Sequence, residues 1–323
     1  MKNWIVVAVF VALLTPAFSL GAPPSLQPRP IDDESYGESY TAVALLENGT
    51  YILLQLLFTN AGFGSEKPAC RALVVPPSGA PWNHAERGDR EDWNYDKGKN
   101  KLSALACSFR GGAADTQFQV KMDGRTVILR SPTRLARHFP PKRRIVLDDG
   151  MFEAEVLLPW SPVKATISGK GLGGAEGIGR LYIDHTRSNA MMKDVADVWL
   201  RFRGFMGENR MLFQGRLPAD TSAFVGWSWM EGEAAPVPFK KGEVKRNKRQ
   251  GKDGFVLSAS GRAGTVVTKK LLFTYKPVEE YGVLGSLAKS IVGDPIIRTY
   301  HAVWTGKDGS QIEGVLETMD LDD

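Results

Sequence analysis

The chain has 323 residues, 43% of them hydrophobic, and a formal net charge of +5 at pH 7. This composition is typical of a globular protein with a buried core, and the length allows two domains of ordinary size or one large one. The positive charge is too weak to indicate binding to nucleic acid.

The first 21 residues have the order of features of a secretory signal. A positive start is followed by an almost unbroken apolar stretch, Trp4 to Leu14, and then by small residues. We therefore expect cleavage after Ser19 or Gly21 and a periplasmic or secreted mature protein. The alternative is a retained membrane anchor, but the apolar stretch is shorter than the roughly 20 residues that a spanning helix needs.

Three dipeptides predict tight hairpin turns, namely Asn48-Gly49, Asp123-Gly124 and Asp308-Gly309. Each accepts the positive φ of a two-residue turn, and each lies between two segments with strand character. Many short strands at this spacing indicate an all-β protein, either a barrel or a sandwich. The predicted strands are Tyr40–Leu46, Tyr51–Thr59, Arg71–Val75, Leu102–Phe109, Thr116–Met122, Thr126–Arg130, Phe152–Leu158, Leu181–His185, Asp197–Phe205, Arg210–Leu217, Ala223–Met230, Phe255–Ser258, Val266–Tyr275, Arg298–Thr305 and Gln311–Thr318.

The segment Tyr51–Phe58 is apolar on both faces, whereas a barrel strand normally shows one face to water. We expect one face to line a first barrel and the other to pack against a second domain. Cys107 lies in a further predicted strand of this half, and Cys70 directly precedes another. In an oxidising compartment they are candidates for a disulfide, and two buried free thiols are the alternative.

Glycine is concentrated between Gly169 and Gly179. We interpret this segment as the junction between two β domains, residues 32–168 and 180–323. It contains a G-x-G-x-x-G match, but the dinucleotide-binding motif needs a helix after it, and Leu181–His185 is predicted as a strand. No cofactor is therefore expected.

The second half concentrates aromatic and charged side chains on strand faces. Asp184 lies next to His185, and a carboxylate beside a histidine can support proton transfer near neutral pH. Successive strand residues point to opposite faces, so the two cannot share one pocket unless the strand ends there, and a structural role is the alternative. An apolar pocket with a polar mouth, or else ordinary core packing, is predicted from Tyr182, Trp199, Arg201, Trp227, Trp229, Tyr300 and Trp304.

A basic run at residues 240–252 predicts a long solvated hairpin. It is a candidate for peripheral contact with an anionic membrane surface, and a plain solvated loop is the alternative. Further along, Val283 to Val292 repeats apolar residues on one helical face, and Gly293 with Pro295 ends the pattern. One short amphipathic helix is therefore expected in the second domain.

The histidines do not form a metal-binding pattern. His84, His138, His185 and His301 lie far apart in the sequence, and no cysteine cluster accompanies them, so no metal site is expected. The chain also has no G-x-S-x-G elbow and no phosphate-binding loop.

Two segments resemble a known family, YILLQLLFTN at residues 51–60 and GRLYIDH at residues 179–185. They are similar to the AttH-like and carotenoid-hydratase-like superfamily, which includes survival-factor-type proteins. The resemblance implies two lipocalin-like antiparallel β-barrels in tandem and an apolar ligand, often an isoprenoid or a lipid. It also implies Asp184 and His185 as catalytic candidates, although Thr186-Arg187-Ser188 replaces the tryptophan-glycine expected soon after this pair.

These features support three hypotheses about function. The preferred one is an exported binding protein for an apolar small molecule, held in the second barrel or between the barrels. The first alternative is a hydratase- or isomerase-type enzyme with Asp184 or His185 as general acid. The second is a structural envelope protein whose interior is filled by its own side chains.

Overall fold

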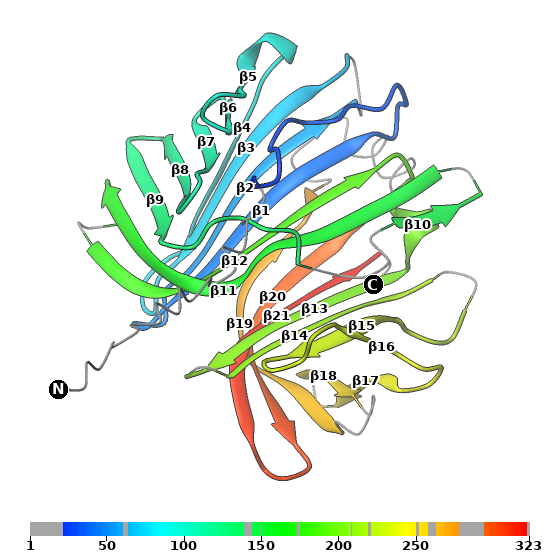
Figure 1. Ribbon diagram of the computed structural model, residues 1–323. Helices are drawn as coiled ribbons and strands as arrows, with labels where there is room; N and C mark the ends of the chain where they lie inside the picture. Colours follow the sequence, from blue (N-terminus) through cyan, green and yellow to red (C-terminus); the bar gives the residue numbers. More distant parts are fainter. Residues whose placement is uncertain are drawn as a thin grey trace, which may run out of the picture.

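The computed structural model is almost entirely β-sheet, as the strand pattern predicts. Two antiparallel sheets follow one another along the chain, with twelve strands in the first and nine in the second (Figure 1). The structure describes residues 22–60, 64–138, 144–148, 150–172, 175–207, 209–218, 221–249, 252–257, 263–277 and 294–321. The signal segment predicted at residues 1–21 and the helix predicted at Val283–Val292 lie outside these residues.

The first sheet has the strand order β4-β3-β2-β1-β12-β11-β9-β8-β7-β6-β5, and β10 pairs with β11. Its strands are β1 Gly37–Leu46, β2 Tyr51–Thr59, β3 Lys67–Val75, β4 Trp82–Arg87, β5 Trp93–Asp96, β6 Lys101–Ala104, β7 Cys107–Gly111, β8 Thr116–Met122, β9 Arg125–Ser131, β10 Arg144–Leu147, β11 Gly150–Gly169 and β12 Ala175–Ser188, with a 3₁₀ turn, η1, at Arg90–Asp92. The prediction of one strand over Leu102–Phe109 was wrong. Leu105 adopts a φ of 51°, and the chain turns there from β6 into β7.

The second sheet has the strand order β16-β15-β14-β13-β21-β20-β19-β18-β17. Its strands are β13 Val198–Met206, β14 Asn209–Leu217, β15 Val225–Met230, β16 Val237–Pro238, β17 Val244–Arg249, β18 Lys252–Leu257, β19 Gly264–Tyr275, β20 Ile296–Gly306 and β21 Gln311–Asp320. The predicted turn at Asp308-Gly309 joins β20 to β21, and Gly309 has the positive φ, 80°, that such a turn needs.

Both faces of β2 are buried, as the apolar pattern of this strand predicts. Ile52 and Leu54 belong to the core enclosed by the first sheet. Tyr51 and Leu53 point the other way and pack in a cluster that also contains Trp229 of the second sheet. The outer face of β2 is therefore covered by the second sheet, and the apolar area buried there stabilises the association of the two sheets.

The glycine-rich segment does not join two domains. It connects β11 to β12, which pair with one another inside the first sheet. Gly169 has a φ of 112°, and a Cβ at this position would collide with the carbonyl oxygen of Gly124, so a side chain would not fit. Residues 180–188, which we expected to open the second domain, are therefore part of the first sheet.

The chain passes between the sheets through residues 189–197, which include one helical turn, α1 Met192–Val195. Val195 and Trp199 pack against Phe152 of β11 and Met319 of β21. The phenyl and indole rings of Phe152 and Trp199 have centroids 4.9 Å apart. This cluster closes one end of the contact between the sheets.

A disulfide joins Cys70 of β3 to Cys107 of β7, with a Cα–Cα distance of 5.6 Å. The two strands lie in opposite halves of the strand order, so the bond crosses the interior of the first sheet. Both cysteines are buried in the core of this sheet. The cross-link therefore ties the two halves of the curled sheet together.

Replacing both cysteines by alanine should lower the free energy of unfolding by about 2–4 kcal/mol, since the bond restricts the unfolded chain over a separation of 37 residues. The measurement is urea unfolding of the oxidised parent and of the double variant, followed by tryptophan fluorescence. A double variant as stable as the parent would contradict this prediction. Adding a reductant to the double variant should change nothing.

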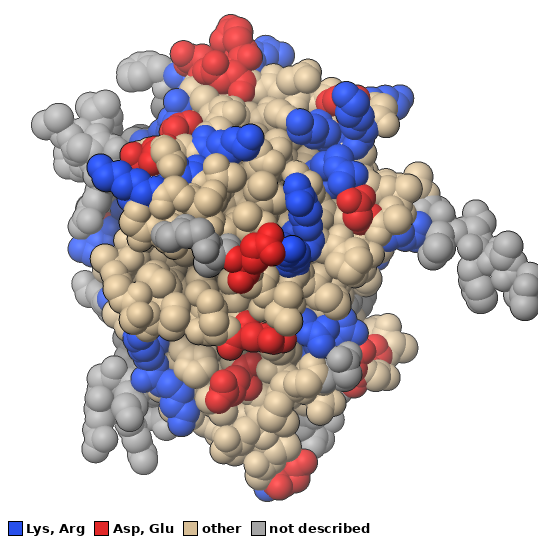
Figure 2. All heavy atoms as spheres, turned by 90° about the vertical axis from the view of Figure 1, so that its left-hand side faces the viewer, with Lys and Arg blue, Asp and Glu red and all other residues tan. Residues whose placement is uncertain are grey.

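Charges of both signs are distributed over the surface. On the face shown in Figure 2, lysine and arginine side chains are interspersed with aspartate and glutamate. The basic run at 240–252 contributes to a hairpin of β17 and β18, in which Arg246 forms an ion pair with Asp320. Within the part of the chain that the structure describes, no helix is long and apolar enough to cross a membrane.

Candidate functional site

His185 is held between two carboxylates on the inner face of the first sheet. In β12 it lies directly opposite Tyr40 of β1 and Glu155 of β11. Its Nε2 is 2.8 Å from Oε1 of Glu38, and its Nδ1 is 3.1 Å from Oε1 of Glu155. Three adjacent strands thus build a chain of carboxylate, imidazole and carboxylate.

Glu38 is the buried end of this chain and has no solvent exposure. Its Oε2 accepts hydrogen bonds from the hydroxyl of Tyr36 at 3.0 Å and from the backbone N–H of Arg29 at 2.8 Å. The ring of Tyr40 stacks on the imidazole of His185 with a centroid distance of 4.4 Å. These contacts fix the position of Glu38 and the plane of the histidine ring.

The two carboxylates favour the doubly protonated form of His185. Burial alone would lower the pKa of this histidine, but the hydrogen bonds to Glu155 and Glu38 outweigh burial and raise its pKa above the ordinary value. For Glu38, burial raises the pKa, and the hydrogen bond and charge of His185 reverse this effect and lower it. Both shifts favour an imidazolium between two carboxylates.

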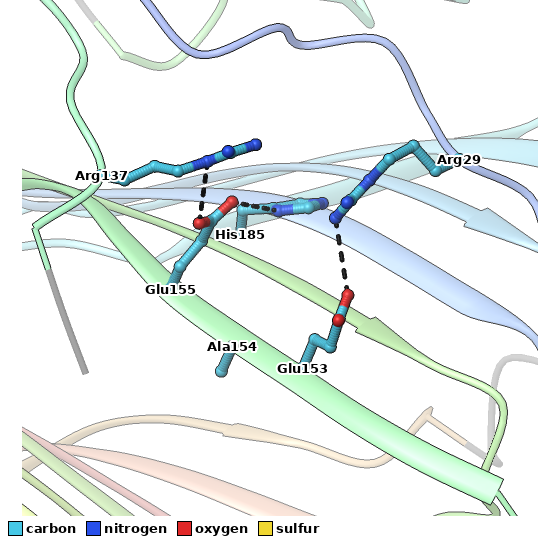
Figure 3. A pocket seen from close by; sticks show the side chains of 6 residues that line it. All are labelled: Arg29, Arg137, Glu153, Ala154, Glu155 and His185. Carbon is cyan, nitrogen blue, oxygen red and sulfur yellow. Dashed lines mark hydrogen bonds and ion pairs between the residues drawn. The ribbon is translucent and has the colours of Figure 1, made fainter. Parts of the chain in front are cut away.

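A hollow of about 120 Å³ opens beside this chain. Glu155 and His185 form its inner wall, and Arg29, Arg137 and Glu153 surround it (Figure 3). The Nε of Arg137 is 3.1 Å from Oε2 of Glu155, and a guanidinium nitrogen of Arg29 is 3.5 Å from Oε2 of Glu153. The site therefore combines two carboxylates at the hollow, Glu153 and Glu155, with two exposed cations, Arg29 and Arg137.

The pH dependence of stability should show the charge of His185. The pKa of His185 is higher in the folded protein than in the unfolded chain, where it is about 6.5. The protonated histidine therefore stabilises the fold fully below about pH 6.5, and this stabilisation is lost as the pH rises through the folded pKa. The parent should therefore lose stability above about pH 6.5, and His185→Gln should not show this loss. Urea unfolding between pH 5 and 9 measures the difference.

Two other groups do not obscure this test. Burial lowers the pKa of His138, so this histidine changes stability only below about pH 6.5. The pKa of Glu38 is lowered in the folded protein, so its carboxylate stabilises the fold above about pH 4.3. This stabilisation is lost only as the pH falls through the folded pKa, which is outside the range of the test. Equal slopes for the parent and His185→Gln above pH 6.5 would contradict a charged His185.

The structure places Asp184 and His185 on opposite faces of β12, as the alternation of strand residues predicts. Asp184 faces the second sheet, where its Oδ2 is 3.3 Å from Arg201 and 3.4 Å from Arg203. Arg203 is buried and also lies 3.7 Å from Glu317 of β21. Asp184 thus belongs to a cluster of charges between the sheets, and it does not line the hollow beside His185.

The aromatic residues expected to line one pocket lie in three separate clusters. Tyr182, Trp227 and Trp229 pack between the two sheets. Trp199 lies in the cluster beside α1, and Trp304 packs inside the second sheet with Tyr300 at its edge. The structure therefore does not bring these side chains together around one ligand site.

The sequence interpretation missed Glu38 and Glu155. Both lie in strands on the same face as buried apolar residues, so the signal was a charged residue at an inward-facing position. In β1 the inward positions include Glu38, Tyr40 and Ala42. The predicted strand began only at Tyr40, so Glu38 lay outside it. Among the described residues, no group of three or more acidic, histidine or cysteine side chains is arranged to hold a metal ion.

Comparison with known proteins shows similarity in structure. No protein-family model and no curated protein sequence matches the chain. A crystal structure described as an AttH (NE1406) from Nitrosomonas europaea has a TM-score of 0.60 and 10% identity, covering 93% of this chain and 99% of that one. Crystal structures of CghA and of kievitone hydratase from Nectria haematococca are also similar.

The match to CghA has a TM-score of 0.58 and 11% identity, and it covers 92% of this chain and 94% of that one. The match to kievitone hydratase has a TM-score of 0.55 and 8% identity, and it covers 88% of each chain. Likeness at this level of identity establishes the fold alone. The chain therefore has the all-β, lipocalin-like fold of the AttH and hydratase structures, which is the fold that the resemblance of its two sequence segments implies.

Proposed function

We propose that the protein is an acid–base enzyme that moves a proton on a small organic molecule at the hollow beside His185. The observation that carries this proposal is the buried chain of Glu38, His185 and Glu155, whose last member lines the hollow. Buried charges destabilise a fold unless they are paired, and clusters of shifted pKa values gather at functional sites. This assignment uses His185 and leaves Asp184 out of the chemistry.

Each side chain has a distinct role in this proposal. Glu155 is the general base, since its carboxylate lines the hollow. His185 is a positioning residue that holds Glu155 through Nδ1 and is itself held by Glu38. The guanidinium groups of Arg29 and Arg137 lie where they can stabilise negative charge that develops on a substrate.

These roles suit proton removal from a carbon next to a carbonyl group. The carboxylate of Glu155 takes the proton, the electron pair of the C–H bond forms a carbon–carbon double bond, and the π pair of the carbonyl group moves onto its oxygen beside an arginine. Return of the proton from Glu155 to another carbon completes an isomerisation. In a dehydration the carbonyl group re-forms, the bond to the β-hydroxyl breaks, and the proton on Glu155 passes to this hydroxyl, which leaves as water. One of the structural neighbours is named a hydratase, which agrees with this class of reaction.

The size of the hollow limits what it can hold. Its volume of about 120 Å³ compares with about 30 Å³ for one molecule of liquid water. The hollow therefore accommodates a reacting group of a few non-hydrogen atoms, and the remainder of a larger substrate would lie outside it.

Exchange of carbon-bound protons in D₂O tests this function without knowledge of the natural substrate. We expect 4-hydroxybutan-2-one to exchange its C3 protons faster with protein than in buffer, as followed by proton NMR. Glu155→Gln should slow the catalysed exchange by about 100-fold or more. Glu176→Gln is the matched control, because Glu176 forms an exposed ion pair with Lys164 far from the hollow. Catalysis that survives in Glu155→Gln, or its absence in the parent, would overturn the proposal.

Binding of an apolar molecule is the second candidate function. It is favoured by a recess of about 380 Å³ at one end of the second sheet, which Trp304 and two methionines help to line. Solvent extraction of the natively purified protein, followed by mass spectrometry, should recover a stoichiometric apolar molecule. An empty extract together with an inactive hollow would favour the structural alternative.

We also propose that the mature protein is exported. The disulfide between Cys70 and Cys107 supports this, since structural disulfides persist mainly in oxidising compartments. N-terminal sequencing of protein released from the envelope should start just after residue 19 or 21. A chain recovered from the cytoplasm with its first residues intact would contradict export.

Peripheral contact with an anionic membrane surface through residues 240–252 is a further proposal. The basic residues in this range support it, because clustered lysine and arginine side chains attract anionic lipid headgroups. Co-sedimentation with vesicles of phosphatidylglycerol at low salt should fall when Lys240 and Lys241, both exposed, are replaced by glutamate. Unchanged sedimentation of that variant would contradict the contact.

A further inference from the structure

The second sheet has a recess at the end that carries the β13–β14 and β20–β21 turns. The recess measures about 380 Å³, which is within the usual range for sites that bind small molecules. Met206 of β13 and Asn209 of β14 form one side, and the β20–β21 turn forms the other. The mouth of a curled sheet is a frequent location for ligands, because strand ends leave space that the core does not fill.

The floor of the recess is apolar and continuous with the core of the second sheet. Trp304 and Ile312 belong to that core and also line the recess. Met206 and Met230 complete the apolar lining, and Met206 is 47% exposed although it is a large apolar side chain. Methionine side chains adapt to ligands of different shape, so this lining suits an alkyl chain.

The rim of the recess carries one lysine, Lys307, and one aspartate, Asp308. Oδ1 of Asp308 accepts hydrogen bonds from the backbone N–H and the hydroxyl of Ser310, which hold the charged carboxylate against its own turn. Lys307 next to it is exposed, and within the described ranges its ammonium group has no ion-pair partner. A negatively charged group at the mouth would therefore meet Lys307 above an apolar floor.

We propose that this recess binds a single-chain amphiphile with a carboxylate head, with the alkyl chain over Trp304 and the head beside Lys307. The proposal rests on the second candidate function, binding of an apolar molecule, and it names the chemical class of the ligand. Apolar burial supplies most of the affinity, and the charge of Lys307 orients the molecule. The proton-transfer chemistry proposed for the hollow beside His185 is independent of it.

Calorimetric titration of the full mature chain with decanoate tests the proposal. We expect saturable binding of one decanoate per chain and weaker binding of decan-1-ol and of decyltrimethylammonium. Equal affinity for decanoate and decan-1-ol would overturn the carboxylate assignment and leave the binding function standing. Binding of neither ligand would overturn both.

Two variants locate the site. Met206→Glu places a carboxylate at the mouth and should weaken decanoate binding about tenfold or more. Lys307→Glu should weaken decanoate binding about fivefold and leave decan-1-ol almost unchanged. Both changes are at exposed positions, so the fold should survive, as circular dichroism can verify.

Matched controls separate the recess from the rest of the surface. Val225→Glu changes an apolar side chain that is 41% exposed at the opposite end of β15, and Lys121→Glu reverses an exposed charge on the first sheet. Neither should alter decanoate binding, and His185→Gln should also retain it. Loss of affinity in Val225→Glu equal to that in Met206→Glu would overturn the location.

Discussion

Replacing His185 by leucine should lower the free energy of unfolding by about 3–5 kcal/mol. The change removes a hydrogen-bonded positive partner of Glu38, which is completely buried, and of Glu155, which is 7% exposed. Arg187, 3.8 Å from Glu38, and Arg137, 3.1 Å from Glu155, remain. A buried carboxylate that loses such a partner cannot regain the solvation that it has in the unfolded chain, so the folded state carries the cost. Urea unfolding at pH 6, followed by circular dichroism, measures the effect.

A matched histidine provides the control for this prediction. Nε2 of His301 lies 3.5 Å from Glu313, but that side chain is 69% exposed. His301→Leu should therefore change the free energy of unfolding by less than about 1 kcal/mol. Similar losses for the two histidine variants would contradict the role of the buried carboxylates.

A second substitution should restore part of the stability. Glu38→Gln in the His185→Leu background replaces the carboxylate that has lost its imidazolium partner by a neutral amide that can still accept the hydrogen bond of Tyr36. The double variant should be more stable than the sum of the single effects predicts, by about 0.5–3 kcal/mol. Strict additivity would show that His185 and Glu38 do not interact.

The strands were predictable because their signals are local. Alternating polarity and Asn-Gly or Asp-Gly turns lie within a few residues of each other, and β1, β2, β8, β9, β20 and β21 follow them closely. The double burial of β2 was also predictable, because a strand with two apolar faces needs two apolar surfaces. These features depend on a single stretch of chain.

The domain boundary was not predictable from the glycine content alone. Glycine permits both a flexible linker and a tight reversal, and the sequence does not distinguish them. Here β12 pairs with β1 as well as with β11, so the hairpin places residues 180–188 in the centre of the first sheet. Only the pairing of strands far apart in the sequence shows this.

The candidate site was partly predictable for the same reason. His185 was identified from its own segment, but its partners come from β1 and β11, which lie 147 and 30 residues away in the sequence. The adjacent Asp184, which the sequence offered as a catalytic partner, points to the second sheet. A neighbour in sequence within a strand is thus rarely a neighbour in a site.

Replacing Arg203 by methionine should also lower the free energy of unfolding by about 3–5 kcal/mol. Arg203 is 2% exposed and lies between the sheets, beside Asp184 and near Glu317. Its guanidinium also lies 4.7 Å from the ring centroid of Tyr182. Methionine fills similar space but leaves two carboxylates without this cation, and Asp184 is almost completely buried.

We attribute the large loss of unfolding free energy in Arg203→Met to the burial of its charged partners. The same substitution at an exposed arginine is the control. Arg130→Met removes a hydrogen bond to Gln117 on an exposed part of β9 and should change the free energy of unfolding by about 0.5 kcal/mol or less. Combining Arg203→Met with Asp184→Asn should recover part of the loss, because the carboxylate that has lost one of its two cations becomes neutral. Equal changes in the free energy of unfolding for Arg203→Met and Arg130→Met would contradict this prediction. The charges between the sheets would then be solvated, and apolar packing around Trp229 would hold the two sheets together without them.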